Sequence, residues 1–483
     1  MKTKSLAKLG SVLTAIWLAG CTALQSPVAI PQKSEKALRI AVIADTQVTS
    51  KEATSNYLFR TPFADRVVNV AMRTTAQEVL AAEHLGYMLD SLGQQSPDLV
   101  LYLGDGANSG CDDEIDQFFT VLAAARDRLK APVFFVVGNH DYLATGNQAA
   151  PSMRALACKG GGYVTKAELV ARTAQFNSES WQRYAAGNTG LLGFEDSLES
   201  VMRRPGKGCL AEEEGQQEQF CFYAAVLKVN SAGRTGDIIL ADSSDYSDVV
   251  VQPRIGRSDL AQIAGKRGSI SWSRGGQTEW INDHASKAAS ADFRIIATHY
   301  PSGDLSWNRF WTGRPGDLML GQGVEASSPK KNLWLSAHTH VSTPGEKIVS
   351  LSFENHDGSD RKDYEEINVG STTDHIPHAA IVDVAPDAIR KYPVRSRTVE
   401  QQHECRQMIN SIRLADSYVS PRRGQSVALR LGMTKAYRKR AYQPEVARRN
   451  IEMFLAEPGH ASEREKWVRC LLTEAARVED RFW

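Results

Sequence analysis

Short apolar runs recur along the chain, and most of them stop at a polar residue or a glycine. Runs of this kind are typical of buried strands, whereas apolar residues at helical spacing cover residues 76–92 and 277–288. A glycine-containing turn at residues 231–236 predicts a hairpin between two of the runs. Strands that alternate with helices predict an α/β fold. The predicted strands cover residues 38–44, 99–103, 132–137, 220–229, 238–241, 293–297, 333–335 and 381–384.

Polar side chains follow these runs at their carboxyl ends, where open α/β sheets bind their ligands. Carboxylates, side-chain amides and imidazoles together suit divalent first-row metals such as Mn, Fe or Zn. There are enough such groups to hold two ions. The candidate residues are Asp45, Gln47, Asp105, Asn139, His140, Asp141, His299, His338 and His340.

Five short blocks, taken in order, resemble the signature of the calcineurin-like metallophosphoesterases. That signature runs Asp-x-His, Gly-Asp-x-x-Asn/Asp, Gly-Asn-His-Asp/Glu, a lone His and Gly-His-x-His. The resemblance spans residues 38 to about 384 and implies a four-layer α/β/β/α sandwich, in which two mixed sheets stack face to face under flanking helices. The blocks read Asp45-Thr46-Gln47, Gly104-Asp105-Gly106-Ala107-Asn108, Gly138-Asn139-His140-Asp141, His299-Tyr300-Pro301 and Ala337-His338-Thr339-His340.

The resemblance implies two divalent metal ions that share Asp105 as a bridging ligand. Such a pair of cations lowers the pKa of a shared water, so that hydroxide exists near neutral pH, and neutralises phosphate oxygens during in-line attack. The implied activity is hydrolysis of a phosphate monoester or diester. The first ion would be held by Asp45, Gln47, Asp105 and His340, and the second by Asp105, Asn139, His299 and His338.

Three further side chains receive roles from the resemblance. His140 would protonate the leaving oxygen or stabilise charge on the phosphoryl group, and Asp141 would hold the His140 ring and raise its basicity. Asn108 would position the substrate phosphate or a loop of the site, and an ordinary turn role is equally open. His375 and His378 follow the segment 368–374, which resembles the family's Asn-x-Gly-Ser turn, but they are left out of the predicted site.

Two positions depart from the family pattern. Gln47 stands where a histidine is usual, so the first ion gains a neutral amide oxygen in place of an imidazole, which shifts its preference toward harder ions such as Mn²⁺. Ala337 replaces a glycine, and this matters only if the backbone needs a positive φ there.

The first residues of the chain have the pattern of an export signal. Three lysines precede an apolar run from Leu9 to Leu18, which is too short for a stable transmembrane helix. The run ends in Leu18-Ala19-Gly20-Cys21, which resembles the lipobox of bacterial lipoproteins, so residues 1–21 are predicted to be a signal peptide with Cys21 as the lipidated residue. Thr22 stands where an aspartate would indicate inner-membrane retention, which favours the outer membrane or periplasm. Residues 22–37 resemble a tether.

The chain contains seven cysteines, and six remain when Cys21 is set aside. An even number in an oxidising compartment predicts disulfides, although sequence alone permits fifteen pairings of six cysteines. Pairing of neighbours is the working hypothesis. It joins Cys209 to Cys221 and Cys405 to Cys470, and leaves Cys111 with Cys158.

Composition and charge distinguish two segments in the rest of the chain. The 42% hydrophobic and 23% charged content is that of a globular protein. Residues 38–387 are predicted to form the metallophosphoesterase domain, with a polar insertion of loops and helices at about 142–219. Residues 388–483 are predicted to form a basic helical segment with 20 Lys or Arg against 11 Asp or Glu. Because the net charge of the whole chain is +1, the catalytic part is acidic, which makes nucleic acid an unfavourable partner.

Two other functions stay open at this point. A lipoprotein that keeps the fold but acts as an envelope scaffold would explain Gln47 and the long insertion, and a nuclease would use the same metal chemistry. The sequence does not indicate the substrate or the oligomeric state.

Overall fold

The structure is a computed structural model of the whole chain. It describes residues 30–49, 58–60, 67–69, 79–129, 131–142, 158, 162–185, 187, 190–197, 222–245, 267–271, 275–286, 290–305, 331–340, 348–354, 361–373, 378–394 and 444–472.

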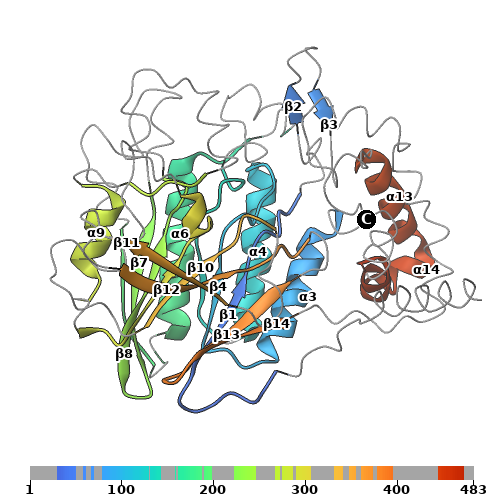
Figure 1. The fold of residues 1–483 in the computed structure, drawn as a ribbon. Helices are drawn as coiled ribbons and strands as arrows, with labels where there is room; N and C mark the ends of the chain where they lie inside the picture. Colours follow the sequence, from blue (N-terminus) through green and yellow to red (C-terminus); the bar gives the residue numbers. More distant parts are fainter. Residues whose placement is uncertain are drawn as a thin grey trace, which may run out of the picture. The chain divides into compact units, whose positions relative to one another are not determined.

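The first sheet has five strands in the order β14-β13-β1-β4-β5 (Figure 1). Strands β1, β4 and β5 run parallel to one another, and β13 and β14 are antiparallel to their neighbours. The three parallel strands therefore end at the same edge of the sheet. The strands cover Leu38–Ile43 (β1), Leu99–Tyr102 (β4), Val133–Phe135 (β5), Ala379–Val384 (β13) and Ile389–Val394 (β14).

The second sheet has seven strands in the order β11-β12-β10-β9-β8-β7-β6. The four central strands β12, β10, β9 and β8 are parallel, and the outer strands are antiparallel. A separate pair, β2 (Leu58–Arg60) and β3 (Val67–Asn69), is also antiparallel. The strands of the second sheet cover Leu191–Asp196 (β6), Ala224–Ser231 (β7), Arg234–Ala241 (β8), Phe293–Ala297 (β9), Lys331–Ser336 (β10), Val349–Glu354 (β11) and Arg361–Asn368 (β12).

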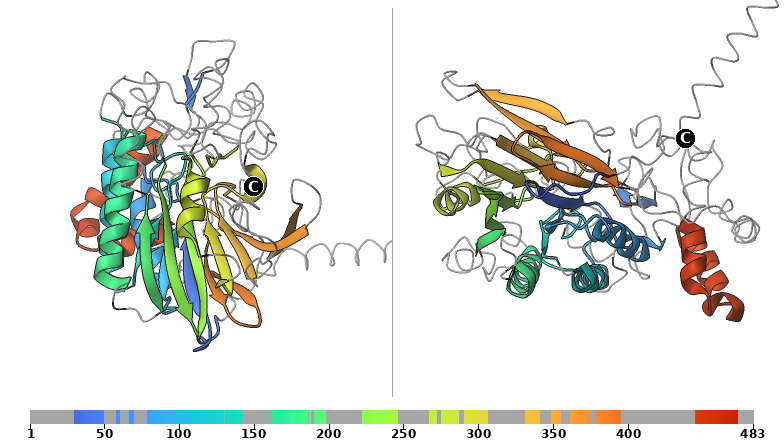
Figure 2. Two further views of the ribbon diagram at one scale, coloured as in Figure 1. Left: turned by 90° about the vertical axis from the view of Figure 1, so that its left-hand side faces the viewer. Right: turned by 90° about the horizontal axis from the view of Figure 1, so that it is seen from below.

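The two sheets pack against each other through one continuous hydrophobic core. Successive side chains of a strand point to opposite faces, so the even-numbered residues of β1 and β5 face the second sheet. Across this interface the ring of Phe134 stacks on Phe194, with 5.9 Å between the centroids. Figure 2 shows the two sheets from two further directions.

Helices cover the outer faces of both sheets. On the first sheet, Phe118 of α4 contacts Tyr102 and Phe135, at ring-centroid distances of 4.8 and 5.3 Å. On the second sheet, Lys228 of β7 donates a hydrogen bond of 2.6 Å to the carbonyl of His284 in α9. The helices cover Ala81–Gly93 (α3), Asp112–Leu129 (α4), Lys166–Ser180 (α6) and Gln277–His284 (α9), with a π-helical turn at Trp181–Ala185.

A buried ion pair fixes the register of β1 against β13. Arg39 and Asp383 are cross-strand partners, and the guanidinium donates two hydrogen bonds of 2.7 and 2.6 Å to the carboxylate. This bidentate geometry satisfies both carboxylate oxygens of a group that would be costly to bury alone.

The prediction of a mixed α/β fold with two sheets is confirmed, and so is the hairpin, which β7 and β8 form. Two expectations were wrong. The insertion at 142–219 does contain a strand, β6, which forms one edge of the second sheet, and residues 389–394 form β14, although helix was expected from residue 388. Both strands lie at sheet edges, where the apolar signal is weak.

The C-terminal segment contains α13 (Pro444–Ala456), α14 (Pro458–Ala461) and a further helix at residues 464–472. These helices share a small hydrophobic core with Leu80, and Arg464 pairs with Glu83 of α3 at 3.1 Å. The prediction of helices here is confirmed for the described residues. Among those residues, no helix has the length and apolar character needed to cross a membrane.

Candidate metal centre

The strand ends bring together the side chains that the sequence had singled out. Asp45, Asp105 and Asn139 follow β1, β4 and β5, while His299 and the loop 338–340 follow β9 and β10 of the other sheet. Two clusters of possible ligand atoms result, and in each the atoms lie within 4.8 Å of one another. They are Asp45, Asp105 and His340, and Asp105, His299 and His338. Asp105 is common to both, as expected for a bridging ligand.

The cluster around His299 also contains Asn139. The Oδ1 atom of Asn139 lies 3.0 Å from Nε2 of His299 and 3.2 Å from Nδ1 of His338. Nε2 of His299 lies 3.3 Å from Oδ2 of Asp105. These four side chains are the set that the resemblance assigned to the second ion.

The cluster around Asp45 also contains Gln47. The amide Nε2 of Gln47 lies 3.2 Å from Oδ2 of Asp105 and 3.1 Å from Nε2 of His340, and Nε2 of His340 lies 3.8 Å from Oδ1 of Asp45. Rotating the Gln47 amide by half a turn would place its oxygen among the same groups, because the two amide orientations occupy the same space. These four residues are the set assigned to the first ion.

The backbone is strained at five of the seven predicted ligands. A positive φ is uncommon for residues other than glycine and costs about 1–3 kcal/mol. Among the described residues, only Ser96 and Ala232 show it elsewhere. Ala337 does not have a positive φ, so its replacement of glycine needs no compensation. The strained ligands are Asp45, Gln47, Asp105, His338 and His340, with φ between 50° and 67°.

Two glycines allow the loops after β4 and β5 to approach each other closely. A Cβ on Gly138 would lie 2.2 Å from the backbone nitrogen of Asp105, and one on Gly104 would lie 2.9 Å from Nδ1 of His299. Gly104 also has a φ of +87°. Side chains at these positions would separate the ligands, which explains why both motifs begin with glycine.

Several positioning contacts come from residues that the sequence analysis did not select. The Leu103 carbonyl lies 2.8 Å from Nδ1 of His299 and leaves Nε2 directed at the cluster. Asn368 donates a hydrogen bond of 2.7 Å to the carbonyl of Ala337 and accepts one from Thr339, which holds the loop of the two histidines. Ser371 donates one of 2.7 Å to the carbonyl of Asp45. No motif spacing marks the Leu103 contact, whereas Asn368 and Ser371 belong to the Asn-x-Gly-Ser segment 368–374. His378 is described, whereas His375 lies outside the described residues.

His140 and Asp141 differ from their predicted arrangement. In place of Asp141, the backbone carbonyl of Asn108 holds the His140 ring, 2.6 Å from Nδ1, and Nε2 of His140 lies 4.0 Å from Oδ2 of Asp105. The Asp141 carboxylate instead accepts backbone N–H groups of Asp105, Ala107 and Gly138, at 3.0, 3.0 and 2.8 Å. Asp141 therefore ties the loops after β4 and β5 together, which a sequence motif cannot reveal.

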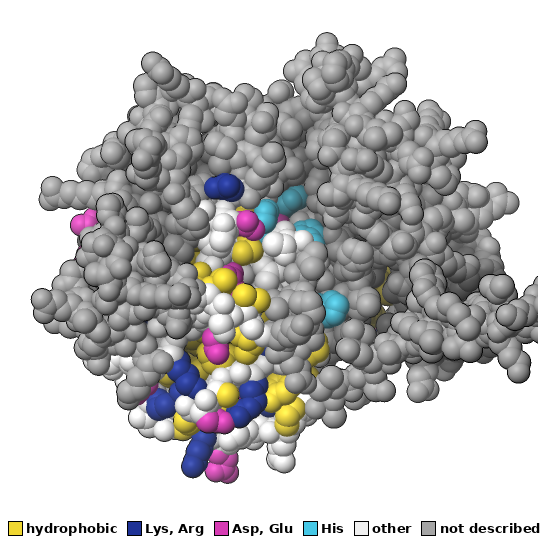
Figure 3. Space-filling model, viewed as in Figure 1, with side chains coloured by type: hydrophobic (Ala, Val, Ile, Leu, Met, Phe, Trp, Pro, Cys, Tyr) yellow, Lys and Arg dark blue, Asp and Glu magenta, His cyan; other side chains and the backbone are white. Residues whose placement is uncertain are grey.

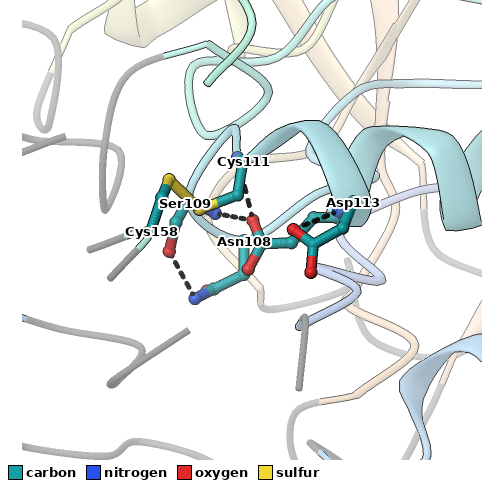
Figure 4. The surroundings of a disulfide bond; sticks show 6 residues. Asn108, Ser109, Cys111, Asp113 and Cys158 are labelled. Atoms are coloured by element: carbon teal, nitrogen blue, oxygen red, sulfur yellow. Dashed lines mark hydrogen bonds between the residues drawn. A yellow bond between two sulfur atoms is a disulfide. The ribbon is translucent and has the colours of Figure 1, made fainter. Parts of the chain in front are cut away.

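A disulfide lies next to the loop that contains Asn108. Cys111 is bonded to Cys158, as predicted, and the carboxylate of Glu114 accepts a hydrogen bond of 2.6 Å from the backbone of Ser109 (Figure 4). The amide of Asn108 donates to the Ser109 hydroxyl at 3.1 Å. Cys470 is also disulfide-bonded, but its predicted partner Cys405 and the predicted pair of Cys209 with Cys221 lie outside the described residues.

The ionisable groups of the centre shift one another strongly. Burial raises the pKa of Asp45 to about 6 and that of Asp141 to about 7. Burial would also raise the pKa of Asp105, but the charges of His299 and His140 outweigh it and lower that pKa. Conversely, burial disfavours the charged His299 ring, and the Asp105 carboxylate outweighs this and raises the pKa to about 9. Acids and imidazoles therefore compete for protons in one buried cluster.

These residues fit a pair of divalent ions. Oδ1 of Asp45 and Oε1 of Gln47 are buried and accept no hydrogen bond from the described residues. Buried oxygens are rarely left without a partner, and both of these belong to residues of the acid and imidazole cluster, whose donor types suit cations. Burial also lowers the pKa of His338 well below its usual value, which keeps the ring neutral and able to act as a ligand.

Residues 38–204 match the family model described as calcineurin-like phosphoesterase. Over these residues the chain is similar to the calcineurin-like phosphoesterases, which use centres of two metal ions. The match identifies the protein as a hydrolase of phosphoester bonds. No curated protein matches the chain.

Three solved structures are similar to parts of this chain. A dimetal phosphatase from Danio rerio is 13% identical, covers 74% of this chain and 99% of its own, and has a TM-score of 0.37. A purple acid phosphatase from yellow lupin seeds is 11% identical, with coverages of 77% and 54% and a TM-score of 0.34. The sulfate thiohydrolase SoxB from Thermus thermophilus is 12% identical, with coverages of 81% and 63% and a TM-score of 0.30. Scores this low carry no argument about this chain.

The candidate metal centre is partly exposed at its two C-terminal histidines. His338 and His340 are partly exposed, while Asp45, Asp105 and His299 are buried. In the space-filling view, histidine side chains reach the surface of the face shown (Figure 3). A cavity of about 370 Å³ also begins at Val48 and Thr49, directly after Gln47, and extends to α3 and α13.

Proposed function

We propose that the protein hydrolyses a phosphate monoester or diester with two divalent ions, at the cell envelope, on a four-layer α/β/β/α sandwich. The observation that carries the activity is the pair of ligand clusters that share Asp105. When bound, divalent ions at such a centre lower the pKa of coordinated water and neutralise charge on phosphate oxygens.

Side chains of the protein would orient the phosphate and donate a proton to the leaving oxygen. Contact with the Asn108 carbonyl fixes the His140 ring with Nδ1 as the hydrogen-bond donor, so Nε2 faces Asp105, and in the imidazolium form it can hand its proton to the leaving oxygen. The backbone N–H of His140 donates to Oδ1 of Asp105 at 2.8 Å, which ties the acid to the shared ligand. Asn108 would position the phosphate, since its Oδ1 is buried and accepts no hydrogen bond from the described residues.

Mn²⁺ is the ion that the donor set favours at the first position. Asp45, Asp105 and Gln47 offer oxygen atoms there and only His340 offers nitrogen, whereas two imidazoles face the second position. Oxygen-rich sites suit harder ions, so Fe and Zn are the alternatives at the second position.

Export and lipid anchoring belong to the same proposal. The apolar run before Cys21 supports a signal peptide whose cleavage leaves a lipidated cysteine at the outer membrane. The Cys111 to Cys158 disulfide supports an oxidising compartment. Incorporation of labelled fatty acid should be lost in Cys21→Ser, and labelling that survives this substitution would contradict the anchor.

Hydrolysis of p-nitrophenyl phosphate and of its bis ester tests the activity. Protein freed of metal by a chelator should be inactive, and added Mn²⁺ should restore turnover of one of the two substrates. If a broad phosphoester panel gave no turnover with Mn²⁺, Fe²⁺ or Zn²⁺, an envelope scaffold would be the better account. Degradation of DNA or RNA in the same assay would instead favour a nuclease.

A further inference from the structure

A buried carboxylate outside the ligand clusters, that of Glu366, lies between the two segments that carry the histidines. Glu366 is in β12, whose neighbour β10 leads into the loop 338–340. Its side chain is on the face of β12 opposite to Ile367, which belongs to the core between the sheets. Only 6% of the residue is exposed, so its charge is almost fully removed from water.

Glu366 accepts hydrogen bonds from both loops. The backbone N–H of Ser302 donates to Oε1 at 3.0 Å, and the Ser302 hydroxyl donates to Oε2. Ser302 is three residues past His299. On the other side, the hydroxyl of Ser336, two residues before His338, donates to Oε1 at 2.9 Å. One carboxylate thus joins the segment that follows β9 to the last residue of β10.

The contacts continue toward the histidine loop. The Ser336 hydroxyl accepts a hydrogen bond of 3.2 Å from the amide of Asn368, and the same amide donates to the carbonyl of Ala337, the residue before His338. On the side of Ser302, the hydroxyl of Tyr364 lies 2.8 Å from the Ser302 hydroxyl and acts as the donor, because the Ser302 proton is directed at Glu366. Every polar atom of this network has a partner, as a buried network requires.

We propose that Glu366 is a positioning residue for the metal centre, which sets the distance between His299 and His338. This inference rests on the proposed function, since it concerns the affinity for the two ions. Groups that orient metal ligands typically change affinity about 10- to 100-fold when they are removed. Burying a carboxylate costs free energy, and three hydrogen bonds from residues next to the two ligand loops give Glu366 a use beyond stability.

Calorimetric titration of metal-free, full-length protein in detergent with Mn²⁺ tests this role without an activity readout. Glu366→Ala is expected to raise the Kd for Mn²⁺ about 10- to 100-fold. Glu366→Gln should raise it less, because the amide oxygen can still accept the Ser302 N–H while the hydroxyls rotate to accept from the amide. Ser336→Ala, which deletes one hydroxyl, should raise the Kd for Mn²⁺ by a smaller factor. It keeps the proposal testable if Glu366→Ala does not fold.

Asp237 provides the matched control. It is also a fully buried carboxylate of the second sheet, and it accepts hydrogen bonds from Ser286 and Arg294, but it lies toward the amino end of β8. Asp237→Ala should lower the melting temperature without changing the Kd for Mn²⁺. Equal losses of affinity in Asp237→Ala and Glu366→Ala, or an unchanged Kd in both Glu366→Ala and Ser336→Ala, would overturn the positioning role. Wild-type protein that bound no Mn²⁺ would instead overturn the proposed function.

Discussion

Replacing Asp105 by asparagine is expected to lower kcat/KM by about 10³-fold or more, because the change removes the charge that both ions would share. Asparagine keeps the size of the side chain. It also keeps an oxygen that can accept the hydrogen bond that the backbone N–H of His140 donates to Oδ1 of Asp105 at 2.8 Å. The loss therefore reports the carboxylate itself and not a collapsed loop. Steady-state kinetics with p-nitrophenyl phosphate at saturating Mn²⁺ measure it.

An exposed carboxylate serves as the control for Asp105. Asp116 lies on the solvent side of α4, where it pairs with the exposed Arg172. Surface pairs of this kind contribute about 0–1 kcal/mol, so Asp116→Asn should leave the kinetics unchanged. If Asp105→Asn kept more than about a tenth of the wild-type kcat/KM, a loss of about 1.4 kcal/mol or less, Asp105 could not be a shared ligand.

Replacing His140 by alanine is expected to lower kcat about 10²- to 10⁴-fold for a substrate with an alcohol leaving group, the range for removal of a general acid. The decrease should be much smaller for p-nitrophenyl phosphate, because p-nitrophenolate leaves without being protonated. His140 contributes no atom to either ligand cluster, so the number of bound Mn²⁺ ions should not change.

The comparison of leaving groups separates two roles of His140. A general acid predicts the unequal losses, whereas a group that only stabilises charge on the phosphoryl oxygens predicts similar losses for both substrates. Similar losses would therefore contradict proton donation through Nε2. A fall in the number of bound Mn²⁺ ions would show that the 4.0 Å approach of His140 to Asp105 matters for the ions instead.

The predicted ligands could be found from sequence because each of them follows a strong strand signal. Asp45 and Asp105 come directly after fully buried apolar strands, and parallel strands end at one edge of a sheet. Gln47 and His340 are 293 residues apart, yet the amide and the ring lie within 3.1 Å. The order of the blocks predicted that these distant residues meet, and the topology of the two sheets brings them together.

Other features left no readable signal. Strand β12 reads Arg-Lys-Asp-Tyr-Glu-Glu-Ile-Asn, which is polar enough to pass for a loop, and this hid Glu366. Helix α4 begins with three acidic residues and has mixed polarity, so its apolar face did not stand out. The His140 ring is held by the Asn108 carbonyl and not by Asp141. This depends on the directions in which side chains point within a tight loop, which the spacing of residues along the chain does not encode.

Anomalous X-ray scattering from crystals grown with Mn²⁺ tests the shared metal centre most directly. The account predicts two Mn²⁺ peaks about 3.5–4 Å apart, both within bonding distance of Asp105, with His340 beside one and His299 beside the other. A single peak, or two peaks of which only one touches Asp105, would contradict it.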